Sequence, residues 1–152
     1  MKFQNVLSHS SPRDHEKMNA VILWCIDPRL RGVYLPFLES LELHPGGVVR
    51  LKCAGGAKVL APSARQYERQ AAIHQVSFAL SKFVPERLIL TTHADCGAYG
   101  GLSRFGGSHD REREAHAVEL CEARSLVARY GYHEDQTEMY FVNFDGALRL
   151  EA

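Results

Sequence analysis

The chain has 152 residues, of which 45% are hydrophobic, and its 18 lysine and arginine residues are balanced by 18 aspartate and glutamate residues. This length and apolar content suit one compact domain with its own core. The balanced charge provides no overall field that would attract nucleic acid or an anionic membrane, so we expect neither as a partner.

Strands and helices are predicted to alternate along the chain. Uninterrupted apolar runs at 20–25 (AVILWC) and 87–93 (RLILTTH) are typical of strands buried on both faces of a parallel sheet. In chain order we expect a strand at 20–25, a short helix at 31–41, a strand at 47–53, a helix of about five turns after residue 63, a strand at 87–93, a helix from about 110 to 130, and a strand at 139–144.

The two longer helices carry recognisable end signals. Ser63 and Gln66 form a capping-box pattern, and apolar residues follow at a spacing of three and four, namely Ile73, Val76, Leu80 and Phe83. The second helix begins with acidic residues, and Gly131 stands just past its end.

This alternation predicts an α/β domain with a mostly parallel central β-sheet flanked by helices. We expect a short N-terminal arm at 1–19 and a single domain at 20–152. The first residues contain no apolar run of the signal-peptide type, and no apolar stretch reaches about 18 residues, so we expect a soluble, cytoplasmic protein.

Three potential metal ligands stand at the ends of two predicted strands. Cys25 ends the first strand, while His93 and Cys96 lie three residues apart at the end of another. Ligands bind beyond the carboxyl ends of the strands in such sheets, which places both motifs at one edge. Two sulfurs and an imidazole suit Zn²⁺, and a set of three protein ligands leaves one coordination position open, as in catalytic zinc sites.

Asp27 and Arg29 follow Cys25 at every second position, so in an extended segment all three side chains point the same way. Pro28 favours an extended Asp27. A carboxylate beside zinc can accept a hydrogen bond from a bound hydroxide, and Arg29 can hold that carboxylate and keep it ionised. Alternatively, at lower pH Asp27 itself takes the fourth metal position and switches the site off.

The motifs C-I-D-P-R (25–29) and H-A-D-C-G (93–97) resemble the zinc motifs C-x-D-x-R and H-x-x-C of the β-class carbonic anhydrases, and R-L-K-C-A-G-G (50–56) resembles the R-N-A-G loop of that family. The resemblance implies a β-carbonic anhydrase-like fold with Cys25, His93 and Cys96 as zinc ligands and Asp27 with Arg29 as a catalytic pair. It implies a zinc lyase that hydrates carbon dioxide reversibly to bicarbonate by metal-bound hydroxide. We also expect a homodimer or a larger homo-oligomer, because the edge of the sheet and the short N-terminal arm need cover.

The sequence departs from that family at Cys53, which stands where asparagine is usual. Cys53 could line the pocket, pack in the core, or act as a fourth ligand and close the site. The arm is short, and no glutamine-bearing substrate segment lies between the first two motifs. A zinc-binding protein without turnover, or a hydrolase of carbon disulfide or carbonyl sulfide, is therefore the alternative function.

Simpler interpretations also exist for the same residues. Cys25 and Cys96 could be buried small hydrophobes, and Asp27 with Arg29 could be an ordinary surface ion pair. The spacing from Cys25 to Arg31 also matches the C-x5-R loop of cysteine phosphatases, although Pro28 removes a backbone donor from such a loop. Five histidines outside the motifs (44, 74, 109, 116 and 133) are expected at the surface or at caps, and His109 or His116 could shuttle protons.

Overall fold

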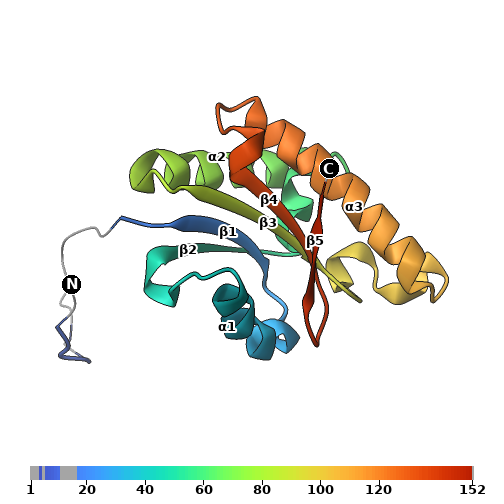
Figure 1. Cartoon of the computed structure of the whole chain (residues 1–152), viewed down its shortest axis with the longest axis horizontal. Helices are drawn as coiled ribbons and strands as arrows, with labels where there is room; N and C mark the ends of the chain where they lie inside the picture. Colours follow the sequence, from blue (N-terminus) through green and yellow to red (C-terminus); the bar gives the residue numbers. More distant parts are fainter. Residues whose placement is uncertain (1–3, 5, 11–16, 152) are drawn as a thin grey trace.

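The structure, a computed structural model, describes residues 4, 6–10 and 17–151. Within these residues the chain forms one five-stranded sheet with the strand order β2-β1-β3-β4-β5 (Figure 1). The first four strands pair in parallel, and β5 runs antiparallel to β4. The strands are β1 (Ala20–Cys25), β2 (Val48–Cys53), β3 (Arg87–His93), β4 (Thr137–Val142) and β5 (Ala147–Leu150).

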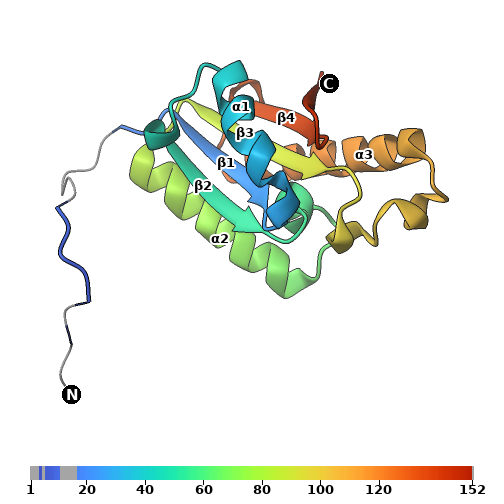
Figure 2. The ribbon, with the colours of Figure 1, turned by 90° about the horizontal axis from the view of Figure 1, so that it is seen from below.

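Helices cover both faces of the sheet. The principal helices are α1 (Arg31–Ser40), α2 (Gln66–Phe83) and α3 (His109–Ala128). Figure 1 shows α1 below the sheet and both α2 and α3 above it, and Figure 2 shows the same layers from below. The predicted α/β architecture with a mostly parallel sheet is therefore confirmed.

The alternation of side chains along β1 explains why helices are needed on both faces. Ile22 and Trp24 pack into a core beneath α1, whereas Val21 and Leu23 pack into a second core with α2 and α3. Every residue of β1 is buried, as expected for a central strand that is covered on both sides.

The register of the parallel strands aligns their carboxyl ends. Cys25 at the end of β1 lies opposite Cys53 at the end of β2, and β3 runs beside β1 in the same direction. The loops that follow these three strands therefore meet at one edge of the sheet, where ligands bind in open α/β folds. The arrowheads of β1, β2 and β3 point the same way in Figure 2.

Some sequence predictions about element ends were wrong. α2 begins at Gln66, and its first turn is closed by Glu68, whose carboxylate accepts from the Arg65 N–H at 3.1 Å. The capping box is thus not formed by Ser63, which accepts a hydrogen bond from Lys58 instead. The short strand β5 was not predicted, because a four-residue strand with three exposed positions carries no clear apolar alternation.

Among the residues that the structure describes, none of the helices has the length and apolar character needed to cross a membrane.

Candidate metal centre

One compact group of metal-ligating side chains occurs among the described residues, and it consists of Cys25, His93 and Cys96. One donor atom of each residue lies within 4.8 Å of the donor atoms of the other two, and all three side chains are buried. Cys25 is the last residue of β1, His93 is the last of β3, and Cys96 follows in the loop. The structure thus brings together the three ligands that the sequence predicts, at the edge where the strands end.

The geometry of this group fits a tetrahedral metal ion. The two sulfur atoms are 4.0 Å apart, and sulfurs bound at about 2.3 Å to a tetrahedral zinc would lie about 3.8 Å from each other. His93 Nδ1 lies 2.8 Å from the Ala94 carbonyl oxygen. A carbonyl oxygen can only accept, so Nδ1 carries the proton and Nε2 presents a lone pair.

His93 Nε2 is buried, yet within the described part of the chain it has no hydrogen-bond partner. A buried polar atom without a partner costs free energy, unless a further group such as a bound ion interacts with it. The second nitrogen of a metal-bound histidine commonly donates to a carbonyl oxygen, as Nδ1 does here. This unpartnered nitrogen beside two sulfurs is the observation that best indicates a metal site.

The two cysteines form a hydrogen-bonded pair. The hydrogen bond from Cys96 lowers the pKa of the Cys25 thiol, while the pKa of Cys96 is raised by the same contact. The Gly55 N–H also donates to Cys25 Sγ at 3.2 Å. Cys25 is therefore prepared as a thiolate, and a bound cation would displace the remaining proton from Cys96.

Asp27 and Arg29 lie beside the three ligands. Arg29 Nε donates to both carboxylate oxygens of Asp27 at 3.1 Å, and Nη2 donates to Oδ2 at 2.7 Å. Asp27 Oδ2 is also 3.9 Å from His93 Nε2. The Arg29 hydrogen bonds hold the pKa of Asp27 below its usual value, so the carboxylate is ionised at neutral pH. Asp27 is not part of the compact group, which leaves three donors and an adjacent carboxylate.

Two further contacts of Arg29 were not predicted from the sequence. Asp95 accepts hydrogen bonds from its guanidinium, and the Phe144 ring lies 4.9 Å from it. Asp95 belongs to the H-A-D-C-G motif, so its position in that motif could have suggested a role. Phe144 follows β4 and carries no comparable signal.

The loop after β2 approaches the centre from a third strand. Cys53 is half-buried, and burial followed by the charge of Cys25 raises its pKa, so it is a poor thiolate in this arrangement. It lies outside the compact group.

Gly56 has a φ of +61°, and a Cβ atom there would lie 2.2 Å from the Thr91 carbonyl oxygen. Only glycine therefore lets the loop approach β3 this closely.

The phosphatase interpretation is disfavoured by the backbone after Cys25. Such a loop needs several N–H groups directed at one anion. Here the Arg29 N–H donates to Asp27 Oδ1, the Leu30 N–H to the Asp27 carbonyl, and the Arg31 N–H to the Pro28 carbonyl. These donors are occupied within the turn.

His116 was expected at the surface or at a cap, and this prediction was wrong. Its side chain is 0% exposed, and its ring stacks on Tyr99 with a centroid distance of 3.8 Å. Phe105 and Phe141 complete the aromatic surroundings. Burial lowers the pKa of His116 to about 4, so the ring is neutral at pH 7. A histidine in this state is a poor proton shuttle.

Acid should therefore destabilise the protein through His116. Its pKa is about 4 in the folded state and about 6.5 when unfolded, so the unfolded state binds more protons as the pH falls through this window. The stability that this neutral histidine contributes is complete above pH 6.5 and lost by pH 4, which amounts to roughly 3 kcal/mol. Urea unfolding at pH 7 and pH 4.5 should show a smaller acid loss for His116→Phe than for the wild type. The exposed residue His74 supplies the control variant His74→Phe, which should lose as much stability as the wild type; an equal loss for His116→Phe would contradict the expectation.

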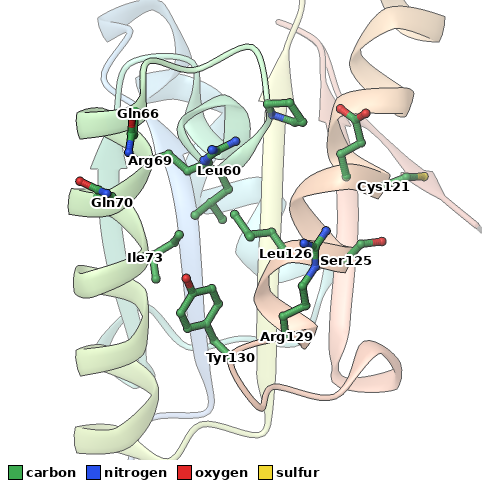
Figure 3. A pocket seen from close by; sticks show the side chains of 12 residues that line it. Leu60, Gln66, Arg69, Gln70, Ile73, Cys121, Ser125, Leu126, Arg129 and Tyr130 are labelled. Carbon is green, nitrogen blue, oxygen red and sulfur yellow. The ribbon is translucent and has the colours of Figure 1, made fainter.

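A separate cavity of about 480 Å³ lies between α2 and α3 (Figure 3). Arg69 and Ile73 line it from α2, while Cys121 and Leu126 line it from α3. None of the three grouped ligands borders it, so this cavity is distinct from the candidate metal centre.

Comparison with known proteins relates the fold to one class of enzyme. No family model and no curated protein matches the sequence. Among solved structures, a β-carbonic anhydrase from Trichomonas vaginalis aligns with a TM-score of 0.60 at 10% identity, over 93% of this chain and 87% of that chain. A structure of tetrameric β-carbonic anhydrases from Sordaria macrospora aligns with a TM-score of 0.56 at 13% identity, over 91% and 83%.

A β-carbonic anhydrase from Aspergillus fumigatus aligns with a TM-score of 0.57 at 12% identity, over 94% of this chain and 95% of that chain. At such identities the likeness establishes the fold. The chain has a β-carbonic anhydrase-like fold, as the sequence motifs predict, and carries on it a Cys-His-Cys group that could bind a metal.

Proposed function

We propose that this protein is a zinc-dependent lyase that converts carbon dioxide and water reversibly to bicarbonate and a proton. The observation that carries the proposal is the juxtaposition of three buried donors, Cys25, His93 and Cys96, with the ionised carboxylate of Asp27. Its location at the carboxyl edge of a β-carbonic anhydrase-like fold supports the same reaction.

The ligands would set the pH range of activity. Zinc in such a site supplies a hydroxide nucleophile, because as a Lewis acid it lowers the pKa of water. Cys25 and Cys96 would contribute two negative charges, which reduce this effect relative to a site of three neutral histidines. We therefore expect activity to increase from pH 7 into the mildly alkaline range, between the pKa of about 7 for a tri-histidine site and about 9 for aqueous zinc.

Asp27 would orient the nucleophile. Its Oδ2 atom lies 3.9 Å from His93 Nε2, one of the three grouped donors. An ionised carboxylate there would accept a hydrogen bond from the nucleophile and so fix its orientation beside the three donors. Arg29 keeps Asp27 ionised and in place through its paired hydrogen bonds.

We also propose a homo-oligomer, a dimer or larger, in a reducing compartment such as the cytoplasm. The solved relatives from Sordaria macrospora are tetrameric. Here β2 is an edge strand, and large apolar side chains such as Leu35, Phe78 and Val118 are exposed. Reduced thiols, as a metal centre of this type requires, persist in a reducing environment.

Stopped-flow hydration of carbon dioxide at pH 7 and pH 8.5, with the zinc content of the same sample measured, tests the proposal. Activity should scale with zinc content and be higher at pH 8.5. Stoichiometric zinc without hydration at either pH would refute it and leave a zinc-binding protein without this activity. Assays with carbonyl sulfide and carbon disulfide would then test the alternative hydrolase function.

A further inference from the structure

Asp95 is the member of the H-A-D-C-G motif that lies between the ligands His93 and Cys96, and it contacts the other motif directly. Arg29 Nη1 donates to Asp95 Oδ2 at 3.0 Å, and Arg29 Nη2 donates to the Asp95 carbonyl oxygen at 2.8 Å. These residues are 66 positions apart in the sequence. The loop after β3 therefore holds the arginine that belongs to the loop after β1.

Asp95 is itself held by two further hydrogen bonds in an uncommon backbone conformation. Its φ is +50°, a left-handed conformation that is uncommon for residues other than glycine. Its Oδ1 atom accepts the Leu102 N–H at 3.0 Å, and its own N–H donates to Glu112 Oε1 at 2.7 Å. Glu112 is 0% exposed. A strained residue held by a buried carboxylate is a feature that surrounding structure must maintain, as is common at functional sites.

The donors of Arg29 are divided between the carboxylate of Asp27 and the carboxylate and backbone carbonyl of Asp95. Nε and one N–H of Nη2 serve Asp27, while the second N–H of Nη2 and one of Nη1 serve Asp95. The Phe144 ring lies over the guanidinium. The Arg29 side chain is half-exposed, at 47%, and a single exposed ion pair would hold it weakly. Asp95 supplies the second attachment that prevents its rotation.

We propose that Asp95 is a positioning residue, which holds Arg29 and thereby keeps Asp27 directed at the Cys25–His93–Cys96 group, with Glu112 as its buried anchor. The inference deepens the proposed function and rests on it for its kinetic consequences. The position of Arg29 itself can be measured without turnover.

Asp95→Asn is the sharpest variant. Asparagine has nearly the same shape and tolerates positive φ. Its amide oxygen can still accept the hydrogen bond from the Leu102 N–H. Its NH₂ group would face Arg29 Nη1, so two donors would meet and that hydrogen bond would be lost. Asp95→Gly is the second variant, because glycine adopts this φ without strain and removes the carboxylate altogether. Asp135→Asn is the control, since Asp135 is exposed and precedes β4 at the opposite end of the strands.

The first measurement is the ¹⁵N–¹H signal of Arg29 Nε in the full chain, assigned by its loss in Arg29→Ala. Asp95→Asn and Asp95→Gly should shift this signal and speed its hydrogen exchange at least tenfold, while Asp135→Asn leaves it unchanged. An unmoved Arg29 signal in a folded Asp95 variant would overturn the proposal. This result is independent of whether the wild type hydrates carbon dioxide.

The second measurement is a double-mutant cycle on kcat/KM with zinc content held equal. Asp95→Asn should lower kcat/KM by about 10–100-fold, the usual effect of losing an outer-shell partner, and should add nothing in the Arg29→Ala background. Equal losses in both backgrounds would show that Asp95 acts by another route and would overturn the proposal. If wild-type protein with full zinc has no activity, the proposed function fails while the Arg29 signal still decides the role of Asp95.

Discussion

Replacing Cys96 by serine should abolish stable zinc binding. Cys96 Sγ is one of three grouped donors and lies 4.0 Å from Cys25 Sγ. A serine hydroxyl is not deprotonated near neutral pH and is a poor zinc ligand compared with a thiolate. If a zinc site is worth on the order of 10 kcal/mol, loss of one of three ligands removes about 3 kcal/mol, or roughly a hundredfold in affinity.

Zinc per chain after dialysis, together with competition against a chromogenic chelator, measures this effect. His93→Ala should behave in the same way. Cys121→Ser is the matched control, because Cys121 is a partly buried thiol on α3 that lies outside the ligand group. Retention of stoichiometric, tightly held zinc by Cys96→Ser would remove Cys96 from the ligand set. Adding zinc to the metal-free proteins should also raise the Tm of the wild type and of Cys121→Ser, and leave the Tm of Cys96→Ser unchanged.

Asp27→Ala should retain zinc and lose most of its activity. The substitution leaves the three grouped donors in place, and Arg29 keeps its hydrogen bonds to Asp95. It removes the ionised acceptor beside His93 Nε2, so the nucleophile loses its orientation. Positioned acid–base groups contribute about 10²–10⁴-fold to rates, and we expect a decrease in kcat/KM of about a hundredfold or more.

Initial rates of carbon dioxide hydration, normalised to zinc content, provide the measurement. Asp110→Asn is the control, since Asp110 is also a carboxylate paired with a neighbouring arginine, Arg113, but its side chain is 78% exposed on α3. Its activity should remain at the wild-type level. Full activity of Asp27→Ala would exclude Asp27 from the mechanism, and loss of zinc from this variant would instead indicate that Asp27 is a metal ligand.

The sequence by itself determined the layered α/β fold and the composition of the candidate site. Apolar runs at 20–25 and 87–93 are long enough to report burial on both faces, and the structure contains β1 and β3 at these residues. Strand polarity then places the ends of β1 and β3 at one edge, so the convergence of Cys25, His93 and Cys96 could be predicted from the sequence.

Only the tertiary structure decided which loops touch beyond those strand ends. The contact between Arg29 and Asp95, the approach of Gly56 to the Thr91 carbonyl, and the burial of His116 among aromatic rings depend on strand order, register and packing. Periodicity along a chain reports which face of one element is apolar. It contains no information about which side chain from a distant loop will fill a given position, because that is settled by packing and hydrogen bonding between elements once the sheet has formed.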